Sequence, residues 1–430
     1  MRQLDVKMMH PRVQIIKVIH KIYRRGMTTT SGGNISIKDN NGDIWVTPSA
    51  IDKGNLKEED VICVKKDGTI VGKHKPSSEF PFHKAIYEAR KDIKSIIHAH
   101  PPALVSFSII REIPNTKVTS LANKICGEIG YAPYALPGSE ELGLIIAKQF
   151  VNCNTKAIIM ENHGTVLGGS DLEDAYCRFE TLEYTARTII NAKVIGTPTY
   201  LTDNQLNQLG SQSNIDIDLN NNISYSSKEL FQRKEIVDIV HRSCEQELMI
   251  SSYGTVSVRM ENNDFLITPS NIARWNIETE DIVSVRNGKT ELGKQPSHLV
   301  SLHQKIYELN PHINSIIMTK PPHLMAYSIT GVKFDVRTIP ESWIFLQDVP
   351  NLDYNTLLDN TIPERLDKST PSLLVANESF IVTGDKLIQT FDRLEVAEFS
   401  AKSLIMAAPI SKLVPINDQQ ILDLKAKFLD

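Results

Sequence analysis

Residues 72–88 read GKHKPSSEFPFHKAIYE, and residues 293–308 read GKQPSHLVSLHQKIYE. Each stretch is followed by a second match, KSIIHAHPP at 94–102 and NSIIMTKPP at 314–322. The chain is therefore a tandem repeat whose period is longer than that of solenoid proteins. Because both copies keep the apolar and turn-forming positions, we interpret them as duplicated domains of one fold.

The positions that differ between the copies are the chemically reactive ones. A glutamate and two histidines of the first copy are replaced in the second, and the aligned pairs are Glu79 and Leu299, His98 and Met318, and His100 and Lys320. We infer that the first copy carries the chemistry, whereas the second keeps the fold and has lost that chemistry.

Length and composition limit the class of protein. A chain of 430 residues favours two domains over a single core. A net charge of −4 argues against binding to nucleic acid or to an anionic membrane, and no apolar run is long enough to span a bilayer. The N-terminus lacks the apolar segment of a signal peptide, and five scattered cysteines suit a reducing compartment. We therefore expect a cytoplasmic protein.

The predicted elements follow the same order in both copies. Helical spacing of apolar residues predicts a first helix over 11–24 and its counterpart near 229–244. Helices and strands mix without regular βαβ alternation, so we expect an α/β fold of the α+β type, with a largely antiparallel central sheet flanked by helices in each domain. The predicted limits are a first domain over 1–201, a linker over 202–228, a second domain over 229–408 and a C-terminal tail over 409–430.

The segment His98-Ala99-His100 carries the strongest chemical signal. Side chains two apart on a strand point to the same face, so the two imidazoles converge where the prolines at 101 and 102 end the strand. Two hydrogen-bonded buried histidines are the alternative. His163 favours a metal site, because it ends another strand beside Gly164 and its aligned residue in the second copy is Ser379.

Glu79 follows Pro76-Ser77-Ser78 and has two interpretations. It is either a carboxylate at the start of a helix or an acid–base residue. Leu299 at the aligned position favours the second, since a helix start has no reason to change together with the histidines.

Three short stretches supply small donors and exposed amide groups, namely 31–34, 47–49 and 77–78. Each alone is typical of an ordinary turn. Such donors suit a phosphate monoester. Together, beside a metal, they indicate a neutral phosphate pocket with little help from Lys or Arg.

These motifs together resemble the class II aldolase/adducin family, and most closely its L-fuculose-1-phosphate aldolase branch. The resemblance covers about 11–194, and a degenerate copy covers about 229–406. It rests on the following motifs: Gly33-Asn34-Ile35-Ser36, Thr47-Pro48-Ser49, Pro76-Ser77-Ser78-Glu79 with His83, His98-x-His100, Ala132-Pro133-Tyr134 and Asn162-His163-Gly164.

The resemblance implies roles for individual residues and a zinc-dependent aldehyde-lyase. The zinc ligands would be His98, His100 and His163, with one Zn²⁺ per chain in the first domain; the acid–base residue would be Glu79; and the phosphate-binding residues would be Asn34, Ser49, Ser77 and Ser78. The implied reaction cleaves a ketose 1-phosphate, such as fuculose 1-phosphate, to dihydroxyacetone phosphate and an aldehyde.

Two alternatives to the aldolase remain open at this point. One is a pentulose-phosphate 4-epimerase or a sugar-phosphate dehydratase that uses the same metal-stabilised enediolate, although family epimerases carry Asp where this chain has Glu79. The other is a non-catalytic interaction protein of the adducin type.

The chain departs from the family pattern in two respects. The family's acid tyrosine, which a neighbouring subunit supplies, aligns with Ser120, and Tyr131, Tyr134 and Tyr200 are candidate substitutes. The family forms four-fold rings, so a fused active–inactive pair implies a homo-oligomer. We expect a dimer of tandem chains that forms a pseudo-tetramer, acts on a phosphorylated sugar, and binds neither nucleic acid nor membrane.

Overall fold

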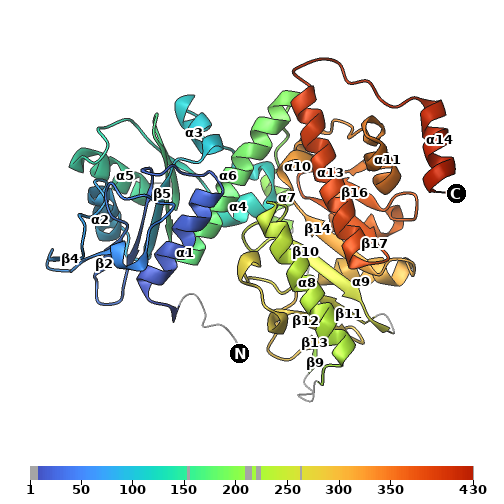
Figure 1. Cartoon of the computed structure of the whole chain (residues 1–430), viewed down its shortest axis with the longest axis horizontal. Helices are drawn as coiled ribbons and strands as arrows, with labels where there is room; N and C mark the ends of the chain where they lie inside the picture. The colour runs from blue at the N-terminus through green and yellow to red at the C-terminus, as the bar shows by residue number, and fades with distance from the viewer. Residues whose placement is uncertain (1–7, 153–154, 209–215, 219–223, 262–263, 430) are drawn as a thin grey trace. The chain divides into compact units, whose positions relative to one another are not determined.

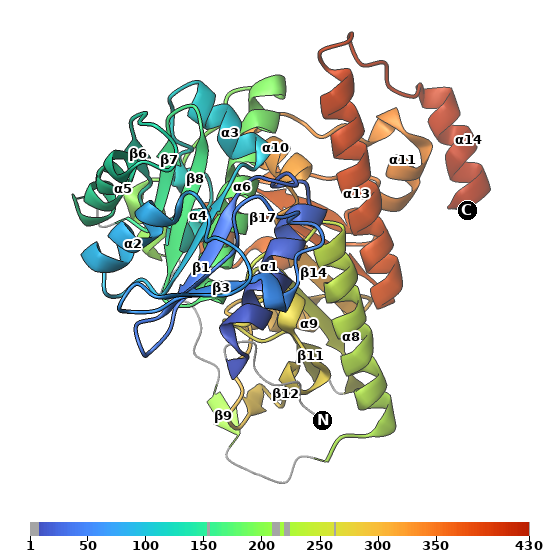
Figure 2. The ribbon, with the colours of Figure 1, turned by 60° about the vertical axis from the view of Figure 1, so that its left-hand side comes forward.

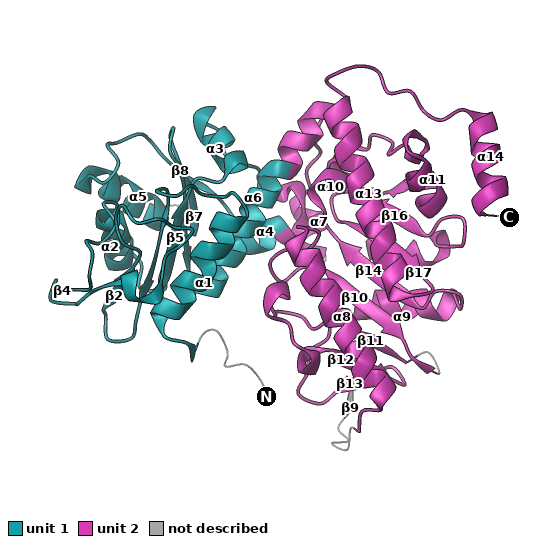
Figure 3. Cartoon of the chain, in the orientation of Figure 1, with its two compact units in different colours: residues 1–116, 122–187 teal, residues 117–121, 188–430 magenta. Residues whose placement is uncertain are grey.

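The computed structural model describes residues 8–152, 155–208, 216–218, 224–261 and 264–429. They fall into two compact units, one formed by 1–116 with 122–187 and the other by 117–121 with 188–430 (Figure 3). Figure 1 shows the order of the elements along the chain. Within the described ranges, no helix combines the length and apolar character that a membrane span requires. The domain limits predicted from the sequence stay predictions.

The first unit is built on an eight-stranded sheet in the order β4-β3-β2-β1-β5-β8-β7-β6. Its strands are β1 (Asn34–Lys38), β2 (Ile44–Val46), β3 (Ile62–Val64), β4 (Ile70–Val71), β5 (Ser95–Ala99), β6 (Gly130–Ala132), β7 (Ala157–Met160) and β8 (Gly164–Gly169). All neighbouring pairs are antiparallel except β6 with β7. The predicted antiparallel sheet is confirmed.

Helices cover both faces of this sheet. They are α1 (Pro11–Arg24), α2 (Phe80–Ala89), α3 (Pro102–Ile109), α4 (Ser120–Cys126), α5 (Glu140–Asn152) and α6 (Leu172–Ile195), of which α4 and α6 continue across the division between the units. Figure 1 shows α2 and α5 on one face and α1 on the other. Phe82 and Ile86 of α2 pack with Ile146 and Phe150 of α5 and with Ile96 of β5 in one apolar core.

The second unit repeats this plan with a nine-stranded sheet in the order β15-β16-β17-β14-β10-β11-β12-β13-β9. Its strands are β9 (Asp216–Asp218), β10 (Thr255–Arg259), β11 (Phe265–Ile267), β12 (Val283–Arg286), β13 (Lys289–Glu291), β14 (Ser315–Thr319), β15 (Asn351–Leu352), β16 (Ser372–Val375) and β17 (Ser379–Gly384). Its helices are α7 (Asp203–Gln208), α8 (Ser227–Glu245), α9 (Val300–Leu309), α10 (Pro322–Thr330), α11 (Pro340–Leu346), α12 (Asn355–Leu358), α13 (Leu387–Ala407) and α14 (Asp418–Phe428). Figure 2 shows α8 and α13 side by side.

Strand register fixes which residues correspond in the two copies. Asn34 pairs with His98 as Thr255 pairs with Met318. Ser95 pairs with Gly169 as Ser315 pairs with Gly384. Equivalent residues of β8 and β17 are therefore 215 positions apart in the sequence. Glu378 is therefore the counterpart of His163. The sequence alignment that placed Ser379 opposite His163 was wrong by one residue.

The reason for that error lies in the turn before β8. Asn162 and Asn377 both have a positive φ, 51° and 56°, in the left-handed region that asparagine tolerates well. The turn shape is therefore the same in both copies, although the residues that follow the asparagine differ. Matching Asn162 to Asn377 would have given the correct register from the sequence.

Candidate metal centre and phosphate pocket

Three histidines meet at one end of the first sheet. His98 lies on β5, His100 follows that strand, and His163 lies in the turn between β7 and β8. Each offers one ring nitrogen, and these three nitrogens lie within 4.8 Å of one another. Gly164 makes this approach possible, because a Cβ at its position would lie 2.6 Å from Cδ2 of His100. The structure thus brings together the histidines that the sequence pattern singled out.

Hydrogen bonding aims the free nitrogen of His98 into the cluster. Its Nδ1 donates to the backbone oxygen of Thr165 over 2.9 Å, which leaves Nε2 as the lone-pair nitrogen. Nε2 lies 3.0 Å from Nε2 of His100 and 3.0 Å from Oε2 of Glu79. Such an outer hydrogen bond fixes the ring orientation of a metal-binding histidine.

Burial keeps two of the imidazoles uncharged. Burial, together with the neighbouring His98, lowers the pKa of His100 to about 3 and the pKa of His163 to about 4. Burial also lowers the pKa of His98, but the facing Glu79 carboxylate outweighs this effect and raises that pKa above its usual value. Neutral imidazole is the form that binds a metal ion.

Glu79 faces the histidines rather than capping its helix. It stands at the N-cap position of α2, yet its side chain makes no capping hydrogen bond. Instead Oε2 accepts from Nδ2 of Asn34 over 2.8 Å, and Oε1 lies 3.3 Å from Nε2 of His163. Burial raises the pKa of Glu79, but His98 and His163 outweigh it and hold that pKa well below its usual range.

The donor set fits a divalent transition-metal cation. Three imidazole nitrogens and one ionised carboxylate converge, and Oε1 of Glu79 is buried without a hydrogen-bond partner. Imidazole and carboxylate oxygen are both ordinary zinc ligands. The residues present therefore suit a divalent metal ion.

His83 supports this centre through its contacts with Ser36 and Asn34. It is fully buried; its Nδ1 contacts Oγ of Ser36 at 2.7 Å, and its Nε2 lies against Oδ1 of Asn34. The second copy keeps the same bond between His303 and Ser257. Since the bond survives where the metal ligands are lost, it supports the fold, and in the first copy it also orients Asn34.

A pocket of about 340 Å³ opens beside the histidines. Its lining includes the four predicted phosphate-binding residues, Glu79 and two of the histidines. The full lining is Thr29, Ser31, Gly32, Gly33, Asn34, Pro48, Ser49, Ala50, Lys53, Ser77, Ser78, Glu79, His100 and His163. Hydroxyl groups and loop amides dominate this lining, which suits a small anion.

Lys53 is the charged residue of the pocket lining that sequence reasoning missed. Its ammonium group is buried and donates to the backbone oxygens of Pro48 and Ile51, over 2.9 and 3.3 Å. Burial lowers its pKa. The pocket is therefore less neutral than we expected. Arg274 bonds the oxygen of Pro269 in the second copy, and this retained cation was the available signal.

The corresponding position in the second unit is filled by an ion pair. Nζ of Lys320 lies 2.7 Å from Oε1 of Glu378, and both side chains are buried. The same Nζ lies 4.2 Å from the ring centroid of Tyr253. Tyr253 occupies the position of Gly32 in the first copy, where the absence of a side chain leaves room beside His100.

Ser120, which aligns with the family's acid tyrosine, lies in the second unit. Its Oγ donates to Oε2 of Glu378, so it contacts the position that corresponds to His163. Of the candidate substitutes in the first unit, neither Tyr131 nor Tyr134 is among the described residues that line the pocket. The source of that acid is thus not found in the pocket lining.

The family model of the class II aldolase and adducin N-terminal domain matches residues 13–190 and again 234–405. The chain belongs to the class II aldolase and adducin family. The two matched regions confirm the predicted family and its tandem arrangement. They also agree with the two sheets described above.

Curated relatives of the chain include aldolases and decarboxylases, which are lyases. An L-fuculose phosphate aldolase of Methanocaldococcus jannaschii is 39% identical over 42% of this chain and 97% of its own length. A 3-oxo-tetronate 4-phosphate decarboxylase of Haemophilus influenzae is 31% identical over 45% of this chain and 93% of its own length. Among solved structures, an L-fuculose 1-phosphate aldolase is 31% identical and covers 46% of this chain and 92% of its own, with a TM-score of 0.42.

Proposed function

We propose that the first copy is a zinc-dependent aldolase that cleaves a ketose 1-phosphate to dihydroxyacetone phosphate and an aldehyde. The convergence of His98, His100 and His163 with Glu79 beside the pocket carries this proposal. The named aldolase relatives support it. The second copy is proposed to be structural, because an ion pair fills the corresponding position.

A divalent cation held by the three histidines would supply Lewis-acid stabilisation of the negative charge that develops on the substrate oxygens. Glu79 moves the proton at the carbon that becomes the carbanion when the carbon–carbon bond breaks. Asn34 orients that carboxylate through its 2.8 Å hydrogen bond.

The phosphate group is assigned to the far part of the pocket. Ser49, Ser77 and Ser78 offer hydroxyl groups there, and Asn34, which lines the same pocket, donates a hydrogen bond to Glu79. The Lys53 ammonium below the 48–51 loop adds positive potential. These groups bind the phosphate, and thereby place the reacting carbons near Glu79.

Decarboxylation of a 3-oxo acid phosphate is the second candidate. It passes through the same kind of enediolate, and the decarboxylase relative favours it over the epimerase and dehydratase considered from the sequence. The two reactions give different products from different substrates. Intact ligand residues in the first copy argue against a purely non-catalytic role.

The proposed setting is the cytoplasm, and the proposed active form is a homo-oligomer in which two tandem chains make a pseudo-tetramer. Cys63 and Cys126 are free thiols, which suits a reducing compartment. The duplicated family domain supports the pseudo-tetramer.

The deciding experiment measures dihydroxyacetone phosphate release from fuculose, rhamnulose, ribulose and 5-deoxyribulose 1-phosphates, with and without a chelator. Chelator-sensitive release from one of them, lost in Glu79→Gln, is the expected result. Metal analysis of the same samples is expected to find one zinc per chain. No release from any sugar, together with carbon dioxide from a 3-oxo acid phosphate, would replace the aldolase by the decarboxylase.

A further inference from the structure

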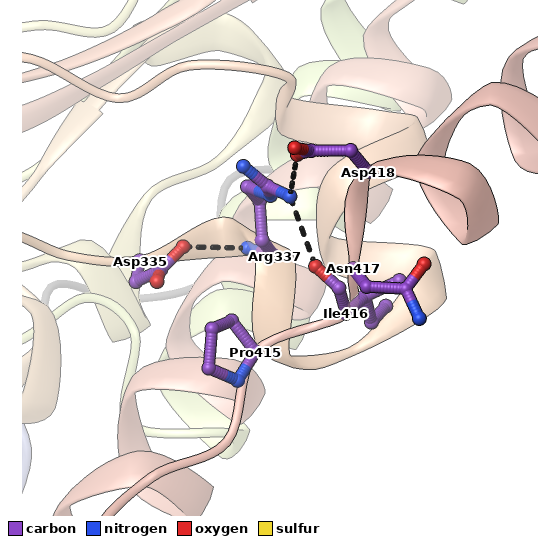
Figure 4. A pocket seen from close by; sticks show the side chains of 6 residues that line it. All are labelled: Asp335, Arg337, Pro415, Ile416, Asn417 and Asp418. Atoms are coloured by element: carbon purple, nitrogen blue, oxygen red, sulfur yellow. Dashed lines mark hydrogen bonds and ion pairs between the residues drawn. The ribbon is translucent and has the colours of Figure 1, made fainter.

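Two pockets formed by the described residues differ in how their polar groups are used. One, of about 290 Å³, lies near the C-terminus in the second unit (Figure 4). There Arg337 donates to the backbone oxygen of Ile416 and to Asp418, over 3.0 and 2.6 Å. Asp335 accepts from the backbone nitrogen of Arg337 over 2.9 Å, so the charged groups of this pocket pair with one another. The pocket beside Glu79 is different, because a side chain that lines it also holds the carboxylate.

That side chain belongs to Asn34, which is held at both ends of its amide group. Nδ2 donates to Oε2 of Glu79 over 2.8 Å, and Oδ1 lies against Nε2 of His83. Asn34 is 2% exposed. It follows Gly33, whose φ is 68° and at which a Cβ would lie 2.8 Å from the backbone oxygen of His98. The amide group is therefore fixed in place and in orientation.

The direction of this chain of contacts follows from the carboxylate, which can only accept hydrogen bonds. The NH2 end of the Asn34 amide must face Glu79, so the amide oxygen faces His83. Nε2 of His83 then carries the ring proton and donates it to that oxygen, and Nδ1 accepts from the hydroxyl group of Ser36 at 2.7 Å. Burial lowers the pKa of His83 to about 3, which keeps the ring neutral, as this arrangement requires. His83 thus sets which end of Asn34 faces the carboxylate.

The second copy keeps the histidine but lacks both the amide and the carboxylate. Thr255 stands at the position of Asn34, and Leu299 stands at the position of Glu79. Nε2 of the retained His303 is consequently buried without a hydrogen-bond partner among the described residues. The fold therefore does not need the amide. Its presence beside the carboxylate in the first copy indicates a role in the reaction.

The amide group of Asn34 has a second hydrogen to offer. A side-chain NH2 group carries two hydrogens, and the bond to Glu79 uses one of them. Because Asn34 lines the pocket, the other is the hydrogen that a phosphate oxygen bound there can accept. The hydroxyl groups of Ser49, Ser77 and Ser78 line the same pocket. A phosphate group held by these serines would share one planar amide group with the carboxylate.

We propose that Asn34 is a positioning residue that couples phosphate binding to the orientation of Glu79, with His83 fixing the amide between them. This inference rests on the proposed function. A phosphate group in the pocket holds the NH2 end of Asn34, and that end holds Glu79 in the orientation from which it moves the proton. The phosphate is remote from the bond that breaks, and its binding energy thereby raises kcat as well as lowering KM.

Supplying the phosphate separately from the sugar tests this coupling. The substrate is the unphosphorylated form of the ketose whose 1-phosphate the wild type cleaves. The probe is inorganic phosphite, which fills a phosphate site and carries no sugar. Saturating phosphite is expected to raise kcat/KM for the unphosphorylated ketose about a hundredfold in the wild type, measured as dihydroxyacetone release, because an error in the position of a catalytic group has an effect of this size.

Asn34→Thr introduces the residue that the second copy already accommodates at this position, so its thermal unfolding and metal content are expected to stay unchanged. It is expected to lose the activation by phosphite, and its kcat for the phosphorylated ketose should fall about a hundredfold. Ser49→Ala is the matched control in the same pocket. It should weaken phosphite binding about tenfold and keep full activation at saturation. Calorimetry with phosphite alone checks that the pocket of each variant is filled.

The part played by His83 is tested in the same assay. His83→Gln keeps a donor toward Oδ1 of Asn34 and is expected to keep the activation by phosphite, whereas His83→Leu is expected to lose it. His303→Leu removes the equivalent ring of the second copy, and measures the loss of stability that such a change causes by itself. Full activation in His83→Leu would contradict the role of His83.

Full activation by phosphite in Asn34→Thr, or a rise in KM at unchanged kcat, would overturn the coupling. An equal loss of maximal activation in Ser49→Ala would overturn it too, because the effect would then belong to phosphate binding in general. So would a wild type that binds phosphite, cleaves the phosphorylated ketose and shows no activation. Failure of the proposed function is seen separately, since the wild type would then release no dihydroxyacetone phosphate from any phosphorylated ketose, and the coupling would fall with it.

Discussion

The end of β5 in the first copy and the end of β14 in the second each hold a buried carboxylate, but they differ in the positive partner offered to it. In the first copy, three imidazoles and the Glu79 carboxylate converge on a place suited to an exchangeable cation. In the second copy, the positive charge is the ammonium group of Lys320, which lies against Glu378 and, as part of a side chain, cannot leave the protein. A buried carboxylate needs a positive partner in both cases. The copies differ in whether that partner can be exchanged.

The comparison also explains why the replacements come as a group. Once a lysine stands at the position of His100, a histidine at 378 would leave its charge unpaired, and a glutamate there satisfies it. Tyr253 then fills the space that Gly32 leaves open in the first copy and lies against the lysine. The second copy thus differs from the first by a different buried charge balance, and not only by the absence of the histidines.

The largest expected effect comes from removing a metal ligand in the first copy. His163→Ala is expected to lose the bound metal and to lower cleavage activity by about a thousandfold or more, since the Lewis-acid contribution is lost. Metal analysis and the dihydroxyacetone phosphate assay check both parts. Met318→Ala, which changes the second-copy counterpart of the first-copy ligand His98, is a control outside the first copy and should leave metal content unchanged. Full activity in His163→Ala would break the assignment of the first copy as the catalytic one.

The second expected effect concerns the ion pair of the second copy. Lys320→Met leaves the Glu378 carboxylate buried without its cation, and should lower the free energy of unfolding by about 3–5 kcal/mol. Denaturant unfolding measures this loss. The double variant Lys320→Met with Glu378→Gln should recover most of it, because no buried charge remains. Equal stability of the wild type and Lys320→Met would show that the pair is not what balances the site.

The phosphate positions give a smaller and more selective effect. Ser49→Ala should raise KM about tenfold, because a hydrogen bond to a charged group is worth about 1.5–3 kcal/mol. Ser270→Ala changes the aligned serine of the second copy and should leave KM as it is. Steady-state kinetics of the two variants, side by side, separate a phosphate contact from a general effect of the loop. A rise in KM for Ser270→Ala would mean that the second copy also takes part in substrate binding.

The smallest effect is expected at Ser120. Ser120→Ala removes its hydrogen bond to Glu378, and should lower the free energy of unfolding by about 1 kcal/mol. The kcat of the folded enzyme should not change, because this serine lies in the second unit against the ion pair. Stability and kcat measured on the same sample check this. A fall in kcat at unchanged stability would return Ser120 to the catalytic machinery.

Local pattern was enough for much of the fold and of the site. The helix predicted over 11–24 coincides with α1, because a run of apolar residues at helical spacing is a local property. His98 and His100 share a face of their strand for the same kind of reason. The repeat identified the reactive positions of the first copy, because the two copies in this one chain can be aligned and differ at those positions.

Contacts between distant segments needed the tertiary structure. The equivalence of His163 in the first copy and Glu378 in the second followed from strand register, which hydrogen bonds across the sheet decide. Lys53 enters the pocket because its loop folds back over the ammonium group, and no spacing in the sequence marks that return. The contrast between buried Ile329 and exposed Ile109, which occupies the equivalent position in the first copy, has the same origin, because burial depends on what packs against a residue rather than on its identity.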